Sequence, residues 1–226
     1  MTHNSADLFI YGSGGHSKVV MDAALNCGFD IKAIFDDDKI KHGKTVFKIP
    51  VLGDRKHALR IASASINSER KMIIAIGENK IREELFLFFK ENDVNFSKII
   101  HPSAAVGSHV EVSCGTVVLA SAIINSGCFV GENVIVNSGA IIEHDCVLME
   151  HVHIAPGSIL CGDVQVGSGT LIGAGSIITP GVKIGKNVTV GAGSVVLSNV
   201  SDGLTVVGQP AKSKNLHRQT DVSGGF

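Results

Sequence analysis

The chain has 226 residues, a formal net charge of −1, 26 glycines and 5% aromatic residues. Its near-zero charge argues against a nucleic-acid or polyanion surface as its main function. No apolar run approaches the roughly 18 residues that span a bilayer, and the N-terminus lacks the basic and apolar regions of a signal peptide. The five cysteines show neither a CxxC spacing nor a small-secreted-domain pattern, so we expect reduced thiols and a cytoplasmic protein.

The first hundred residues alternate between short apolar runs and helical patterns, and we assign residues 1–100 to one α/β domain. Helices are expected after a glycine turn, ending near Gly28, and at residues 54–64 and 79–92. Strands are expected at residues 8–11, 31–35 and 72–76. This alternation predicts a small parallel sheet of the mononucleotide-binding, Rossmann-like type.

A glycine turn links the first strand to the first helix. After a strand, Gly14 and Gly15 leave backbone N–H groups directed at any ligand on the helix N-terminus. Ser17 stands where the full dinucleotide fingerprint would have its third glycine. Asp36 and Asp37, at the end of the second strand, are placed to hold a ribose or sugar hydroxyl. Together these features predict a bound nucleotide or nucleotide sugar. The alternatives are a purely structural turn and a redox dinucleotide. The redox dinucleotide is disfavoured because only half of a doubly wound sheet is present.

The rest of the chain has a period of six. From Val106 to Val196 every sixth residue is aliphatic, which fits neither a helix nor a paired strand alone. A three-sided coil explains the period, with six residues to a side and one aliphatic residue of each side pointing inward. The residue four places further on is small or Val and also points inward, as at Cys128 and Cys146. This is a hexapeptide β-solenoid, assigned to residues 101–212, with a polar tail at 213–226.

Corners and assembly follow from the same pattern. Glycine follows the aliphatic residue where we expect a corner to need an unhindered backbone, at residues 107, 131, 167, 173, 185 and 191. His101-Pro102 marks the junction with the first domain, because a residue before proline leaves helical conformation.

Three prisms can pack side by side with equivalent clefts between chains. We therefore expect a homotrimer.

Two histidines of the solenoid are candidate functional residues. His144 lies off the inward positions, between Glu143 and Asp145, which suits a general base near neutral pH. The alternative is an ordinary solvated histidine. His153 lies one and a half prism sides further on and faces another direction, so the two histidines converge only across an interface between chains. His151 is expected to be structural or at the rim.

Two other chemistries fit this segment poorly. A zinc site of the kind found in γ-class carbonic anhydrases needs one distant histidine and a close pair on facing sides. His144, His151 and His153 lack that offset. A Cys146 nucleophile partnered by His144 has poor geometry, because one residue points into the coil and the other points out.

These motifs resemble a known family. Residues 11–16, 35–37 and 74–82 are similar to the nucleotide-sugar domain of the bacterial acetyltransferases that include the sialic acid O-acetyltransferases and the UDP-4-amino-sugar N-acetyltransferase PglD. Residues 142–146 and 207–212 resemble the solenoid of that family. The resemblance covers nearly the whole chain up to Lys212. It implies an α/β domain followed by a left-handed parallel β-helix.

The resemblance also implies an activity and its residues. It implies transfer of acetyl from acetyl-CoA, as co-substrate and without a metal, to the 4-amino group of a nucleotide-linked 4-amino-4-deoxy sugar. His144 would be the base, oriented by Asp145 where the family usually has Glu. His153 would contact the acetyl thioester, and the backbones of Ala174 and Ala192 the pantetheine arm. The implied nucleotide-sugar contacts are Gly14, Gly15, His16, Asp36, Asp37 and Gly77.

The expected mechanism has no covalent intermediate. His144 takes a proton from the sugar amine as the amine adds to the thioester carbonyl, and thiolate leaves. His153 or a backbone N–H of the coil is the expected donor to the oxyanion. Two other functions stay open on these motifs. One is acetylation of a sugar hydroxyl, as in sialic acid O-acetylation, and the other is a non-catalytic binding or scaffold role.

Overall fold

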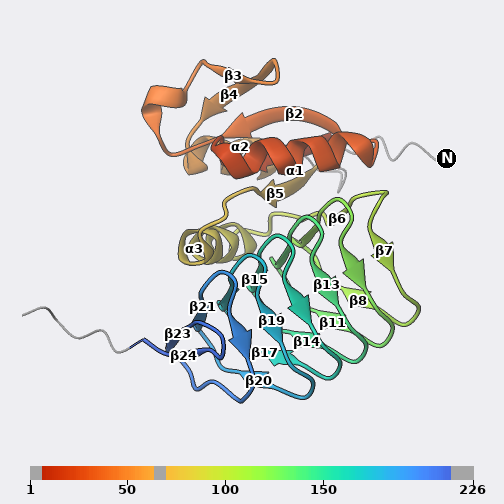
Figure 1. The fold of residues 1–226 in the computed structure, drawn as a ribbon. Coiled ribbons are helices and arrows are strands. Elements are labelled where there is room, and N and C mark those ends of the chain that lie inside the picture. The colour runs from red at the N-terminus through yellow and green to blue at the C-terminus, as the bar shows by residue number, and fades with distance from the viewer. Residues whose placement is uncertain (1–6, 64–69, 215–226) are drawn as a thin grey trace, which may run out of the picture.

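A computed structural model describes residues 7–63 and 70–214. It has two parts, an α/β domain above a three-sided solenoid (Figure 1). The α/β domain consists of β1 (Asp7–Tyr11), α1 (Gly15–Asn26), β2 (Asp30–Phe35), the 3-10 turn η1 (Lys39–Lys41), β3 (Thr45–Val46), β4 (Ile49–Gly53), α2 (Arg55–Ser63), β5 (Lys71–Ile74) and α3 (Asn79–Lys90). No helix in the described residues is both long and apolar enough to span a membrane.

The sheet of this domain has the order β3-β4-β2-β1-β5. β1 pairs in parallel with β2 and β5, and β2 pairs in parallel with β4. The predicted strands and helices are present, with bounds that differ by one or two residues. The helix predicted at 54–64 is α2, and its last predicted residue lies outside the described part. β4 was missed because Pro50 interrupts its short apolar run, and proline is uncommon within paired strands.

The solenoid is built of two- and three-residue strands on three sides. The first side holds β6 (Ile99–Ile100), β9 (Val117–Val118), β12 (Ile135–Val136), β15 (His153–Ile154), β18 (Leu171–Ile172), β21 (Thr189–Val190), β23 (Thr205–Val207) and β24 (Lys212–Ser213). The second side holds β7 (Ala105–Val106), β10 (Ile123–Ile124), β13 (Ile141–Ile142), β16 (Ile159–Leu160), β19 (Ile177–Ile178) and β22 (Val195–Val196). The third side holds β8 (Glu111–Val112), β11 (Phe129–Val130), β14 (Val147–Leu148), β17 (Gln165–Val166) and β20 (Lys183–Ile184).

The register confirms the period of six. Ile124 pairs in parallel with Ile142, so one coil takes 18 residues (142 − 124), or three sides of six. The predicted inward aliphatic residues from Val118 to Val196 are at most 3% exposed. Val106 is 38% exposed, because it lies in the terminal coil, which has a stacked neighbour on only one side. The chain is therefore an α/β domain followed by a left-handed parallel β-helix.

The corner glycines are explained by close packing between coils, and not by an unusual backbone conformation. At each of the six predicted glycines the backbone is not left-handed, but a Cβ would come within 2.3–2.9 Å of neighbouring atoms, mostly those of the next coil. Close approach of stacked coils therefore explains them. The left-handed backbone lies two residues later in the corner. Asp145 takes such a place with φ 61°, a conformation that Asp and Asn tolerate better than most residues.

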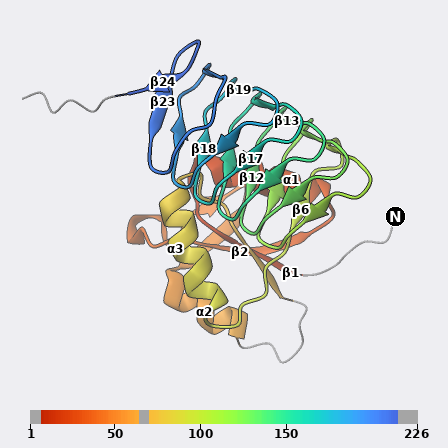
Figure 2. The ribbon, with the colours of Figure 1, turned by 90° about the horizontal axis from the view of Figure 1, so that it is seen from below.

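The α/β domain packs on the first side of the prism. Ile99, Val117 and Ile135 belong to the same buried cluster as Leu8 and Ile10 of β1. Seen from below, the coils cross the α/β domain, with α3 beside them (Figure 2). Because the two parts share a core, the position of every site residue relative to the others is fixed within one chain.

Candidate active site

A cavity of about 370 Å³ opens at the carboxyl ends of β1, β2 and β5. Ligands bind at this edge in open parallel sheets. Gly14 is the N-cap of α1 and provides no side-chain cap, so N–H groups of the first turn stay available to an anion. Ser17, in place of the third glycine, is buried and donates from Oγ to the Gly14 carbonyl at 2.7 Å.

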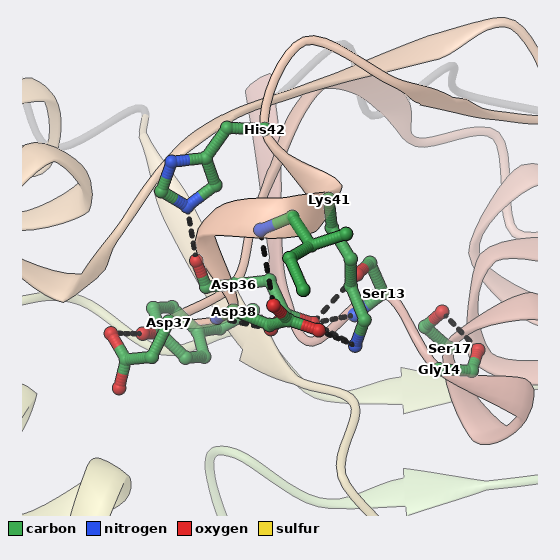
Figure 3. A network of polar contacts seen from close by, with 10 residues as sticks. Ser13, Gly14, Ser17, Asp36, Asp37, Asp38, Lys41 and His42 are labelled. Atoms are coloured by element: carbon green, nitrogen blue, oxygen red, sulfur yellow. Dashed lines mark hydrogen bonds and ion pairs between the residues drawn. The ribbon is translucent and has the colours of Figure 1, made fainter.

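Asp36 organises the loop at one wall of the cavity (Figure 3). Its Oδ2 accepts from the backbone N–H and the hydroxyl of Ser13 at 2.9 and 2.6 Å, and from Lys41 Nζ at 3.1 Å. Its Oδ1 accepts from the backbone N–H of Asp38 at 2.9 Å. Partial burial alone would raise the pKa of Asp36, but these hydrogen bonds outweigh it and lower the pKa. Asp36 is therefore a charged residue that fixes the glycine turn and Lys41.

Asp37 has a different set of partners. It accepts from Tyr11 Oη at 2.6 Å and from Arg55 Nε at 2.8 Å. Burial would raise the pKa of Asp37, but the bonds from Arg55 and Tyr11 lower it. Tyr11, Arg55 and Lys41 were not predicted as partners of the acidic pair. Tertiary contacts bring Tyr11 and Arg55 there, whereas Lys41 comes from the loop that follows β2. The six predicted substrate contacts all line this one cavity: Gly14, Gly15, His16, Asp36, Asp37 and Gly77.

His153 lies between the two domains, below the Gly77 loop. Its Nδ1 is 3.1 Å from the Gly77 carbonyl, and its Nε2 is 3.2 Å from Asn137 Nδ2. A carbonyl can only accept, so Nδ1 carries the proton and Nε2 accepts from Asn137. The ring of His16 lies 6.2 Å away, between centroids. Burial, with the nearby charge of Arg82, lowers the pKa of His16 and of His153 to about 4.

This geometry corrects one expectation. A neutral His153 whose only N–H faces Gly77 has no proton to offer an oxyanion, so it is not placed as that donor. Asn137 is a better candidate and was missed. Its Oδ1 accepts from the Ser138 N–H at 2.8 Å, which fixes the amide orientation. One N–H of Nδ2 goes to His153, and no acceptor in the described residues takes the other.

Arg82 connects the Gly77 loop to the solenoid. It is 1% exposed, and burial lowers its pKa to about 10. Its guanidinium donates to the carbonyls of Asn133 at 3.1 Å, His151 at 2.7 Å and Gly77 at 3.3 Å. His151 is 6% exposed, and its Nδ1 is 2.8 Å from Asn133 Nδ2. His151 is thus part of the packing between the domains.

His144 and Asp145 lie at the opposite side of the prism. We call residues 143–146, with their equivalents in neighbouring coils, the far corner. His144 Nδ1 is 2.8 Å from Asp145 Oδ2, and the side chains are 65% and 67% exposed. That hydrogen bond raises the pKa of His144 and leaves Nε2 free to accept a proton. Glu143 accepts instead from Asn125 Nδ2 at 2.8 Å, so one of the two flanking carboxylates holds the ring.

The predicted site residues therefore fall into separate places within one chain. The far corner joins the second and third sides, whereas the α/β domain covers the first side. Ala174 and Ala192 lie at the corner between the first and second sides, between β18 and β19 and between β21 and β22. His144 thus lies at one edge of the second side, and the two alanines lie at the other.

The two chemistries considered earlier find no support here. Cys146 is fully buried, its Sγ donates to the Cys161 carbonyl at 3.2 Å, and contact with Cys128 together with burial raises its pKa. Such a thiol is a poor nucleophile. Within residues 7–63 and 70–214, no three His, Cys, Asp or Glu side chains are grouped to hold a metal ion.

Comparison with known proteins matches both parts of the chain. Residues 7–87 match the family model described as the PglD N-terminal domain. Residues 163–198 match the model described as the bacterial transferase hexapeptide with six repeats. A curated relative, the uncharacterized protein L142 of Acanthamoeba polyphaga mimivirus, is 29% identical over 126 residues. That match covers 53% of this chain and 24% of the length of the relative.

Several solved structures match almost end to end. The acetyltransferase domain of PglB from Neisseria gonorrhoeae FA1090 is 33% identical, with a TM-score of 0.84, over 93% of this chain and 100% of that domain. PerB from Caulobacter crescentus, in complex with CoA and GDP-perosamine, is 35% identical, with a TM-score of 0.86, over 92% and 97%. WeeI from Acinetobacter baumannii AYE is 26% identical, with a TM-score of 0.81, over 92% and 99%.

Proposed function

The chain belongs to the PglD-like family of bacterial acetyltransferases, and on this premise we propose that it N-acetylates a nucleotide-linked 4-amino-4-deoxy sugar. Acetyl-CoA is the co-substrate of this acyltransferase. The observation that carries the proposal is the end-to-end likeness to PerB, which is solved with CoA and GDP-perosamine. The cavity beside the glycine turn supports it, because it gathers all six expected sugar-nucleotide contacts.

Each part of the chain has a role in this proposal. Residues 1–100 would hold the nucleotide sugar, residues 101–212 would form the acetyltransferase solenoid, and residues 213–226 would be a tail. Strand β6 (Ile99–Ile100) precedes this boundary and already pairs with β9 of the solenoid, which ties the two parts together. The first residues of the tail, Ser213 and Lys214, still pair with β23, since Ser213 belongs to β24 and the Lys214 N–H donates to the Thr205 carbonyl at 2.7 Å. Residues 215–226 lie outside the described part.

A homotrimer is part of the proposal. The outward residues of the second side are all apolar: Ala105, Ile123, Ile141, Ile159, Ile177 and Val195. The α/β domain covers the first side, and the third side is mixed, with Glu111, Gln165 and Lys183 beside the apolar Phe129 and Val147. The second side is therefore the uniformly apolar face that the α/β domain leaves uncovered, and packing three such faces around an axis would bury it.

This packing would also complete the site. In a closed ring of three, each chain meets its neighbour through opposite edges of the same face. One chain would then contribute His144 from the far corner. Its neighbour would contribute Asn137, Ala174 and the nearby His153 from the other edge. The site incomplete in one chain would be completed three times in the trimer.

The reaction follows from these groups. His144 Nε2 would accept a proton from the neutral sugar amine as its nitrogen attacks the thioester carbonyl, a step worth roughly 100- to 10,000-fold in rate. The free N–H of Asn137 would stabilise the oxyanion. The C–S bond then breaks, CoA leaves as thiolate, and the imidazolium returns its proton to thiolate or solvent. Asp145 holds the tautomer that makes Nε2 the acceptor.

The decisive experiment offers acetyl-CoA with a panel of acceptors and follows release of free thiol. The panel contains GDP-perosamine, UDP-linked 4-amino sugars, and the matched sugars with hydroxyl in place of amine. We expect release only with amines. Release only with hydroxyl acceptors would replace the proposal by O-acetylation. No release, together with no acetyl-CoA binding by calorimetry, would indicate a scaffold.

A further inference from the structure

The second residue of each prism corner recurs every six positions, and one of these residues is unusual. Only at 162 does this series lack a side chain. The series is Ser108, Cys114, Ala120, Ser126, Glu132, Ser138, His144, Glu150, Pro156, Gly162, Ser168, Ala174, Pro180, Lys186, Ala192 and Ser198. Because residues as different as Glu, Lys and Pro take this place, the backbone does not require glycine there. Gly162 also has no left-handed φ.

The ring of His144 occupies the space beside Gly162. Gly162 lies one coil, or 18 residues, after His144 on the far corner. A Cβ on Gly162 would lie 2.6 Å from both Cε1 and Nε2 of that ring, and 3.2 Å from Nδ1. All three nearest atoms belong to His144. By contrast, a Cβ on Gly167 would meet the backbone of the next coil at 2.6 Å. Gly162 therefore leaves room for one side chain and is not needed for coil stacking.

That room matters because the ring is otherwise weakly held. The His144 side chain is 65% exposed and, within residues 7–63 and 70–214, makes one hydrogen bond, to Asp145. An exposed side chain with a single contact keeps much of its rotamer freedom. Contact with the Gly162 backbone restricts the rotamers of the His144 ring on one side. It thereby keeps Nδ1 on the Asp145 carboxylate.

We propose that Gly162 is a positioning residue, which by having no side chain lets the His144 ring lie against the next coil in contact with Asp145. The proposal rests on the proposed function, in which His144 is the base. A methyl group at 162 would push the ring aside and leave the coil intact, because the atom it meets is the end of a side chain.

The charged groups around the ring determine how its titration responds. On its own corner these are Asp145 and Glu143, and on the preceding coil the titratable thiol of Cys128. Asp163, on the next coil, contacts His144 through its backbone N–H, which donates to the His144 carbonyl at 3.0 Å. Among the described residues only Asp145 is hydrogen-bonded to the ring, and Glu143 accepts from Asn125. A displaced ring loses its largest source of raised basicity. Its pKa then falls toward the ordinary value, and the acid limb of the rate profile moves to lower pH.

The test uses the full chain with Gly162→Ala and with Gly162→Ser, since serine stands at the same corner place at residue 126. Two readouts are measured, kcat with acetyl-CoA and GDP-perosamine, and the His144 pKa by NMR of labelled imidazole. We expect kcat to fall about 10- to 100-fold, the usual cost of a misplaced group. The unfolding midpoint should stay unchanged, and the His144 pKa should fall.

Two controls make the result specific. Ser126→Ala, whose hydroxyl faces Ser108 on the preceding coil, should leave both readouts unchanged. In a His144→Ala background, Gly162→Ala should lower residual turnover no further, because the ring it displaces is gone.

The possible outcomes test the positioning role of Gly162 separately from the proposed function of His144 as base. A folded Gly162→Ala variant with wild-type kcat and wild-type His144 pKa overturns the positioning role. A lowered pKa with unchanged kcat supports positioning and contradicts His144 as base. Absence of wild-type turnover with every amine of the acceptor panel removes the proposed function, and the NMR titration still decides the role of Gly162.

Discussion

His144 at the far corner and His153 between the domains are nine residues apart, yet their surroundings give them opposite properties. His144 is exposed beside a carboxylate, and its pKa is raised. His153 is partly buried near Arg82, and its pKa is lowered to about 4. A residue at the edge of the prism can exchange protons with a substrate. A residue beneath the α/β domain is kept neutral and can only shape the site.

The contrast shows how this fold makes different uses of one residue type. Every coil offers outward positions, so a histidine on the second or third side faces solvent or a second chain. On the first side the same position faces the α/β domain. Its chemistry is then decided by groups far away in sequence, here Gly77 and Arg82.

The largest expected effect comes from removing the exposed histidine. His144→Ala should lower kcat at least about 100-fold, because general-base catalysis is lost, while CoA still binds. Thiol release gives kcat and calorimetry gives the dissociation constant of CoA. His109→Asn is the matched control, an exposed histidine two coils earlier on the far corner, and should retain activity. Wild-type turnover in the alanine variant would eliminate the base assignment.

Removal of Arg82, the buried charge near His153, should affect stability more than chemistry. Arg82→Met leaves the carbonyls of Asn133 and His151 without their donors, and we expect the free energy of unfolding to fall by about 2 kcal/mol. Denaturant titration measures it. Lys90→Met, which breaks an exposed pair between α3 and Glu132, should cost less than about 1 kcal/mol. Equal losses in the two variants would show that Arg82 is not the main connection.

The smallest expected effect concerns the basicity of His144. Because Asp145 raises the pKa of His144, activity should be lost as pH falls through that raised value. Asp145→Asn keeps a residue that tolerates the left-handed backbone and removes the negative charge. The acid limb of the kcat profile should then move to lower pH, because the carboxylate that raises the pKa of His144 is gone. An acid limb that stays in place would separate Asp145 from the titration of the base.

The sequence by itself determined the repeating part of this protein. A period of six with aliphatic residues at one position leaves a single way to bury them, in stacked three-sided coils, so the solenoid could be read from Val106 to Val196. The glycine turn and the Asp36–Asp37 pair were readable because the carboxyl ends of neighbouring parallel strands meet at one edge.

Only the tertiary structure decided which residues meet across that repeat. Asn137 and Arg82 carry no local pattern, and they reach their partners through contacts between segments that are separate in the sequence. The room beside Gly162 exists only when its coil stacks on that of His144. Periodicity fixes the direction of each side chain, whereas burial and charge, which set its chemistry, depend on what the folded chain places against it.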